Sequence, residues 1–250
     1  MALNRRDFLS LTAAGAAATL TAGAASGRIK AVAFDALTVF DPAPAYGQAA
    51  KLFPERGAEL VQLWRTRQFE YCWLRTLNGR YADFRQVTED ALVYAVRALK
   101  LELSAQQKSQ LMEPWLQLRA HPDAMPALKA MREAGLRLAF LSNLTVAMLA
   151  AATKNSALED LFDPPLSTDA VHAYKPDSRA YRMAVDAFGL NKEEIAFAAF
   201  GGWDAAGAKA FGYPTFWVNR LNLPVEELDT RPDASGPQLG DLAQFVKAHS

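Results

Sequence analysis

The chain has 250 residues, 51% of them apolar, enough to bury one large core or a core with a smaller second domain. Lysine plus arginine and aspartate plus glutamate both number 27, so no surplus of positive charge favours a nucleic-acid partner. The single cysteine, Cys72, excludes an internal disulfide, and with three histidines lacking metal-ligand spacing we expect neither a metal nor a cofactor.

Residues 1–27 have the features of a leader rather than of folded structure. Arg5 and Arg6 precede Phe8 and a weakly apolar run of alanine, threonine and glycine that continues to Ala25, and residues 22–24 suit a cleavage site. This resembles a twin-arginine export signal, so we expect export to the periplasm; the alternatives are an uncleaved anchor and a chance basic start. No other stretch is long and apolar enough to span a bilayer, so no membrane partner is expected after leader removal.

The next segment changes from strand to helix within a few residues. Residues 29–35 form a short apolar run ending on Asp35, typical of a strand buried on both faces of a parallel sheet. Pro42 and Pro44 then break the chain, and no convincing strand follows up to residue 118. Apolar residues at three- and four-residue steps predict helices over 58–77 and 84–100. We therefore expect residues 42–118 to form a helical cap domain.

From residue 119 onward, helices and strands alternate. Helices are predicted around 125–131, 176–188 and 204–211, each followed by a glycine. Apolar runs at 136–141, 195–200 and 215–219 predict strands. Such alternation predicts an α/β core, a doubly wound parallel sheet made of residues 28–41 and 119–250.

Polar residues at the ends of these strands are the candidates for chemistry, because ligands of such sheets bind beyond the carboxyl ends of the strands. No clear helix follows Asp35, so a functional role is favoured over a helix cap there. Asp204 has the alternative of capping the helix it begins, and Lys175 that of a solvated loop lysine. The strand-end candidates are Asp35, Ser142, Asn143, Lys175 and Asp204.

These residues resemble the L-2-haloacid dehalogenases of the haloacid dehalogenase superfamily, over nearly all of the chain after the leader. The similar segments are 33–35, 63–65, 71–75, 88–92, 141–143, 174–177 and 203–208, and the stretch 64–75 is the most specific. The resemblance implies a Rossmann-like core with a helical cap inserted after the first strand. It also implies a homodimer that hydrolyses short L-2-haloacids to D-2-hydroxy acids.

The resemblance also implies roles for single residues. Asp35 matches the nucleophile that displaces halide from the α-carbon and forms an aspartyl ester, which water then hydrolyses. Lys175 would keep Asp35 ionised and help hold the substrate carboxylate, while Asp204 would orient Lys175 and the water.

Further roles follow for residues around the substrate. Ser142 would bind the substrate carboxylate or the nucleophile, and Arg65 and Asn143 would stabilise the departing halide. Arg65 has the alternative of a surface residue on an amphipathic helix. The remaining residues matching substrate-binding, pocket-wall or supporting positions are Leu37, Phe84, Tyr181 and Trp203.

The chain departs from the family at two places. After Asp35 it lacks the family's glycine and is about one residue shorter, so that either Thr38 or Val39 takes the place of a threonine. Ala199, Phe200 and Gly201 stand where the family has Ser-Ser-Asn, whose polar groups help position the water. We therefore expect ester hydrolysis to be slowed.

Two rival functions remain open at this point. A phosphatase of the same superfamily needs a second aspartate two residues after the nucleophile and an acidic cluster for Mg²⁺. Leu37 occupies that position, and Asp204 has no acidic neighbour, which disfavours this alternative. The missing serine and asparagine motivate the other alternative, a non-catalytic protein that binds carboxylates.

Overall fold

The computed structural model describes residues 28–250, so the predicted leader lies outside the described residues. Its main sheet has the strand order β5-β4-β1-β6-β7-β8, with all five pairings parallel. The α/β prediction is confirmed. The strands are β1 (Ala31–Phe34), β4 (Arg137–Ser142), β5 (Leu166–Ser167), β6 (Ile195–Ala199), β7 (Thr215–Val218) and β8 (Ala234–Gly236).

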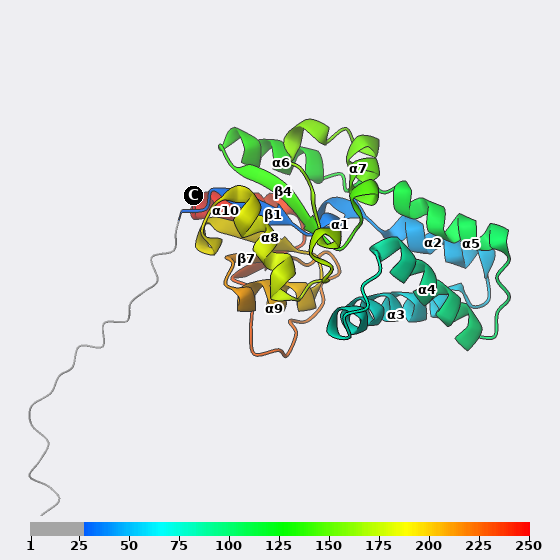
Figure 1. Cartoon of the computed structure of the whole chain (residues 1–250). Helices are drawn as coiled ribbons and strands as arrows, with labels where there is room; N and C mark the ends of the chain where they lie inside the picture. Colours follow the sequence, from blue (N-terminus) through cyan, green and yellow to red (C-terminus); the bar gives the residue numbers. More distant parts are fainter. Residues whose placement is uncertain (1–27) are drawn as a thin grey trace, which may run out of the picture.

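Helices cover both faces of the sheet, because alternate side chains of each buried strand point to opposite sides. Val32 and Phe34 of β1 pack in the cluster formed with α6 (Ala124–Glu133), α7 (Val146–Asn155) and α10 (Leu239–Ala248). Ala31 and Ala33 pack on the opposite face with α8 (Ser178–Phe188) and α9 (Gly202–Phe211). The doubly wound arrangement is therefore present, with β1 in its interior (Figure 1).

Helices of the segment between β2 and β3 gather beside the sheet rather than on either face (Figure 1). A buried polar network joins three of them: Tyr46 donates to Gln68 (2.7 Å), Gln68 to the Thr88 hydroxyl (2.6 Å), and Trp64 Nε1 to the Thr88 carbonyl (2.8 Å). This pairing meets the hydrogen-bonding needs of these groups inside an apolar core. The helices are α2 (Ala43–Leu52), α3 (Gly57–Leu77), α4 (Phe84–Ala98), α5 (Ala105–Met112) and the 3₁₀ turn η1 (Glu113–Leu116).

Three short elements near the edge of this insert differ from the sequence-based expectation. β2 (Phe40–Asp41) pairs antiparallel with β3 (Arg119–Ala120), where the chain leaves for the insert and returns from it. Directly after Asp35, α1 (Ala36–Val39) makes one helical turn. The expectation that no helix follows Asp35 is therefore wrong, since four residues are too few to show a helical period.

Among residues 28–250, no helix combines the length and apolarity needed to cross a membrane.

Candidate active site

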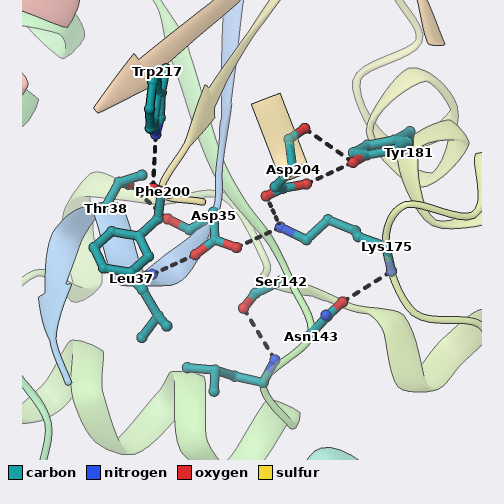
Figure 2. Close-up of polar contacts among 11 residues, drawn as sticks. Asp35, Leu37, Thr38, Ser142, Asn143, Lys175, Tyr181, Phe200, Asp204 and Trp217 are labelled. Carbon is teal, nitrogen blue, oxygen red and sulfur yellow. Dashed lines mark hydrogen bonds and ion pairs between the residues drawn. The ribbon is translucent and has the colours of Figure 1, made fainter. Parts of the chain in front are cut away.

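The carboxylate of Asp35 is held from two sides at the carboxyl end of β1. Its Oδ1 accepts from the Leu37 amide (2.8 Å), as the cap of α1, and its Oδ2 accepts from Lys175 Nζ (2.6 Å) (Figure 2). The Thr38 hydroxyl donates to the Asp35 carbonyl (2.7 Å), so Thr38 rather than Val39 provides the polar group next to the nucleophile candidate. The Asp35 side chain is 13% exposed, which leaves it open to a ligand. It therefore acts as a helix cap and remains accessible.

Lys175 lies fully buried between two carboxylates, with its Nζ 2.6 Å from both Asp35 Oδ2 and Asp204 Oδ2. Burial opposes the charge of Lys175, but attraction to Asp204 and Asp35 outweighs it and raises the pKa of the ammonium group. Lys175 thus stays protonated and pairs with both carboxylate groups. With both carboxylates on its ammonium group and no exposed surface, it is not placed to hold a substrate carboxylate as expected.

Asp204 is the third residue of α9 and not its cap, because the helix begins at Gly202. Its Oδ1 accepts from the Tyr181 hydroxyl (2.7 Å), while Oδ2 accepts from Lys175 (Figure 2). Complete burial raises the pKa of Asp204 to about 6, against the lowering effect of Lys175. The charge of this carboxyl group therefore changes just below neutral pH.

A small cavity opens beside Asp35, with a volume of about 30 Å³. One water molecule needs on the order of 10–15 Å³, so the cavity accepts only a few atoms. Four of the predicted site residues do not contribute to its wall: Arg65, Lys175, Tyr181 and Asp204. The wall is formed by Asp35, Leu37, Phe69, Phe84, Ser142, Asn143, Leu144, Phe200, Gly201 and Trp203.

Ser142 and Asn143, at the end of β4, present hydrogen-bond donors to this cavity. The Ser142 hydroxyl oxygen accepts from the Leu144 amide (3.1 Å), and Asn143 Oδ1 accepts from the Lys175 amide (3.2 Å). Within residues 28–250, the Ser142 hydroxyl hydrogen and the Asn143 amide nitrogen donate to no protein group. Each oxygen already accepts a hydrogen bond from the backbone, and both donors remain free among the described residues, which suits an anionic ligand.

Arg65 lies in a separate, larger cleft of about 480 Å³ that adjoins the small cavity. The cleft and the cavity share Phe69, Phe200, Gly201 and Trp203 in their walls. In the described part of the chain, the Arg65 guanidinium has no ion-pair partner; it lies 5.3 Å from the centroid of the Tyr46 ring. The structure thus places Arg65 next to the site but not on the wall of the Asp35 cavity.

The structure changes the role of Tyr181 and adds Phe69 to the site. Tyr181 is fully buried behind Asp204, and its hydroxyl orients that carboxylate, so it supports the site rather than contacting substrate. Phe69, which the sequence analysis did not select, lines both cavity and cleft. The sequence does contain a signal for Phe69: it follows Arg65 by four residues and so lies on the same face of α3.

The fold and the site together define an α/β protein with an aspartate, paired to a buried lysine, at the end of its first strand. Residues 29–212 match the family model described as haloacid dehalogenase-like hydrolase. The (S)-2-haloacid dehalogenase of Pseudomonas sp. (strain YL) is 42% identical over 206 residues, covering 82% of this chain and 89% of that protein. Haloacetate dehalogenase H-2 of Moraxella sp. (strain B) is 36% identical, with 88% and 98% covered.

Solved structures agree with these relatives. A crystal structure of an L-2-haloacid dehalogenase superposes with a TM-score of 0.85 at 44% identity, covering 88% of this chain and 99% of the other. The enzyme from Xanthobacter autotrophicus, solved with chloropropionic acid covalently bound, has a TM-score of 0.81 at 34% identity, with 89% and 100% covered. The chain belongs to the 2-haloacid dehalogenase family of haloacid dehalogenase-like hydrolases.

Proposed function

We propose that the protein hydrolyses the carbon–halogen bond of short L-2-haloacids and releases halide and a D-2-hydroxy acid. The observation that carries this proposal is the Asp35 carboxylate, ion-paired with a buried lysine at the edge of a cavity that accepts only a few atoms. The names of the relatives support the substrate class.

In the first step, one carboxylate oxygen of Asp35 forms a bond to the α-carbon as the carbon–halogen bond breaks. The bonding electron pair leaves with the halide, and the α-carbon is inverted. The donors of Ser142 and Asn143 bind the substrate carboxylate or the developing halide from the end of β4. Asp35 loses its negative charge when the ester forms, so Lys175 then keeps Asp204 as its remaining carboxylate partner.

In the second step, water attacks the ester carbonyl and the bond from that carbonyl carbon to the substrate oxygen breaks. One hydrogen of the water ends on the hydroxyl group of the freed hydroxy acid, the other is released as a proton, and the Asp35 carboxylate is restored. One oxygen of Asp35 therefore leaves in the product and an oxygen from water replaces it. A single turnover in ¹⁸O-labelled water tests this sequence of bonds. The first product is expected to contain ordinary oxygen, whereas ¹⁸O in that product refutes attack by Asp35.

The second step is expected to be slow in this chain. Ala199 and Gly201 bring no polar side chain to the region beyond β6, where the resembled family has a serine and an asparagine. Mass spectrometry of the enzyme quenched during turnover is expected to show an acyl adduct on the peptide that contains Asp35. Rapid steady turnover without any adduct contradicts this expectation.

Halide release measured with a chelator present separates the proposal from its rivals. Release from L-2-chloropropionate but not from its D-enantiomer supports the dehalogenase. Metal-dependent phosphate release in its place indicates the phosphatase, and binding of haloacids without turnover indicates the non-catalytic protein. Leu37 stands where a phosphatase needs its acid, so halide release is the expected result.

We also propose that the chain is exported by the twin-arginine route to the periplasm and forms a homodimer through its insert helices. Arg5 and Arg6 support export, and replacing both with lysine is expected to retain the protein in the cytoplasm.

Leu74 and Leu77 support the dimer, being 54% and 83% exposed at the end of α3. Sedimentation velocity measures the mass of the assembly.

A further inference from the structure

We propose that Arg220 is a positioning residue for the nucleophile: its guanidinium group anchors the one-turn helix α1 and so fixes the direction of the Asp35 side chain. This inference rests on the proposed dehalogenation, because it concerns the attack of Asp35 on the α-carbon. Arg220 follows β7, two strands away from β1 in the sheet, and stands 182 residues beyond the residue of α1 that it contacts.

The position of the Asp35 carboxylate depends on the short helix α1. The Leu37 amide of this helix binds Asp35 Oδ1 at 2.8 Å (Figure 2). The hydroxyl and the amide of Thr38 both donate to the Asp35 carbonyl, at 2.7 and 3.1 Å. A helix of four residues makes too few internal hydrogen bonds to be stable by itself. The direction of the Asp35 side chain therefore depends on what anchors α1.

The carbonyl group of Thr38 is the point at which Arg220 contacts α1. The last carbonyls of a helix have no partner within it, and the residue four positions after Thr38 is Pro42, which has no amide hydrogen. Arg220 Nη2 donates to this carbonyl at 2.9 Å. The next carbonyl, that of Val39, accepts from the His121 amide at 2.8 Å. Arg220 thus supplies a donor that the chain around Thr38 lacks.

A second set of contacts fixes the guanidinium group itself. Nη2 of Arg220 lies 3.1 and 3.2 Å from the two carboxylate oxygens of Asp123, and the two side chains are only 15% and 22% exposed. Asp123 also accepts from the Leu239 amide at 2.8 Å, which joins the starts of α6 and α10. Burial opposes the charge of Asp123, but the Leu239 amide and Arg220 together lower its pKa. Arg220 therefore links α1 to two helices that pack on the sheet.

Arg220 also lines the cleft of about 480 Å³, which suggests a rival role. A cation there would draw an anionic haloacid towards the site. The contacts favour positioning, because Nη2 is already bound by the Thr38 carbonyl and the Asp123 carboxylate. The two roles differ in kinetics. Attraction changes the substrate concentration needed for half-saturation, whereas positioning changes the rate of ester formation with substrate bound.

Quenched-flow measurement of the first turnover, with L-2-chloropropionate in excess, tests the proposal. Arg220→Ala is expected to lower the maximal rate constant of ester formation about tenfold or more, because Asp35 is no longer held in line with the α-carbon. A rate constant, unlike an amount of product, does not depend on how much of the variant is folded. The half-saturating concentration is expected to change less than about threefold, since the donors of Ser142 and Asn143 belong to the end of β4.

Guanidinium ion is expected to restore the rate of Arg220→Ala, because the space left between Thr38 and Asp123 opens onto the cleft. Saturable recovery with guanidinium sulfate, but not with potassium sulfate, indicates that the lost hydrogen bonds have been replaced. Arg220→Lys guards against misfolding of the alanine variant. Lysine keeps a positive charge near Asp123 but is shorter and lacks the Nη2 donor, so the maximal rate is expected to fall while urea unfolding stays close to that of the parent.

Arg137→Ala is the matched control. Arg137 also binds one backbone carbonyl and one aspartate, those of Phe188 at 2.9 Å and Asp163 at 2.8 Å. It stands at the amino end of β4, the edge of the sheet away from Asp35. This variant removes the same kinds of bond and is expected to keep the maximal rate constant of the parent, with no response to guanidinium.

Hydrogen exchange gives a readout that does not depend on turnover. The amides of Leu37 and Thr38 are both hydrogen-bonded to Asp35. In Arg220→Ala, the peptide that contains them is expected to exchange faster, and added guanidinium is expected to restore its protection. The same peptide of Arg137→Ala is expected to exchange as in the parent.

The failures are distinguishable. If the parent releases no halide, the proposed function fails and this role fails with it. If the parent is active but Arg220→Ala keeps its maximal rate, only this inference is overturned, even where the half-saturating concentration rises. Equal losses of rate in Arg220→Ala and Arg137→Ala overturn it as well, and so does unchanged exchange of the α1 peptide.

Discussion

Replacing Lys175 with methionine is expected to destabilise the fold strongly, because it leaves a buried carboxylate without its counter-charge. Asp204 is fully buried, and in Lys175→Met only the Tyr181 hydroxyl still contacts it by a side-chain hydrogen bond. Removing one partner of a buried ion pair costs about 3–5 kcal/mol. For a chain of this size, that corresponds to a fall in Tm of roughly 6–20 °C.

The loss is expected to depend on pH in a defined direction. Burial already raises the pKa of Asp204 to about 6, and removal of Lys175 raises it further. A carboxyl group whose pKa is raised by folding contributes stability at low pH that is lost as the pH rises through the folded value. Lys175→Met therefore approaches the parent stability near pH 5 and falls away from it towards pH 8.

Urea unfolding of four proteins measures the effect: the parent, Lys175→Met, Asp204→Asn and the double variant. Asparagine keeps an acceptor for Tyr181 without the charge, so the double variant is expected to recover most of the stability lost in Lys175→Met. None of the three variants is expected to recover catalysis, which separates stability from activity. A Lys175→Met protein within about 1 kcal/mol of the parent at pH 8 refutes the reasoning.

Three further predictions concern the nucleophile, the pH dependence of turnover, and assembly. Asp35→Asn is expected to lower kcat at least roughly a thousandfold in halide-release assays and to abolish the acyl adduct; preserved turnover contradicts nucleophilic attack by this residue. Since Asp204 must be ionised to pair with Lys175, kcat/KM is expected to fall as the pH drops through about 6, and a flat profile from pH 5 to 8 speaks against this role. Leu77→Glu is expected to convert a homodimer to monomers in sedimentation velocity with turnover of L-2-chloropropionate preserved; an unchanged mass argues against the α3 interface.

The elements that the sequence predicts well are the long ones with a clear period. α3 and α4 begin within one residue of their predicted starts, since their apolar residues repeat over several turns. β2, β3 and β5 have two residues each, too few for any period, and were not predicted. The terminal helix α10 was also overlooked, although Leu239, Leu242 and Val246 carry the required spacing.

Several residues of the site could be predicted from one rule, that ligands of a parallel sheet bind at the carboxyl ends of its strands. It selected Asp35, Ser142 and Asn143, which line one cavity, because parallel strands end at the same edge of a sheet. The position of Arg65 relative to Asp35 depends on how the insert packs beside the sheet. Spacing along one helix carries no information about that packing, so the separation of Arg65 from the small cavity was not predictable.

The β2–β3 pair has a consequence for how such proteins diversify. The chain enters the insert through β2 and returns from it through β3, and these two strands pair with each other. The two ends of the insert, at Asp41 and Arg119, therefore lie side by side. A helical segment of different length or composition can be grafted between these two points while β1 stays untouched. Recombination at these two points exchanges the helical insert as a unit and leaves Asp35 in place.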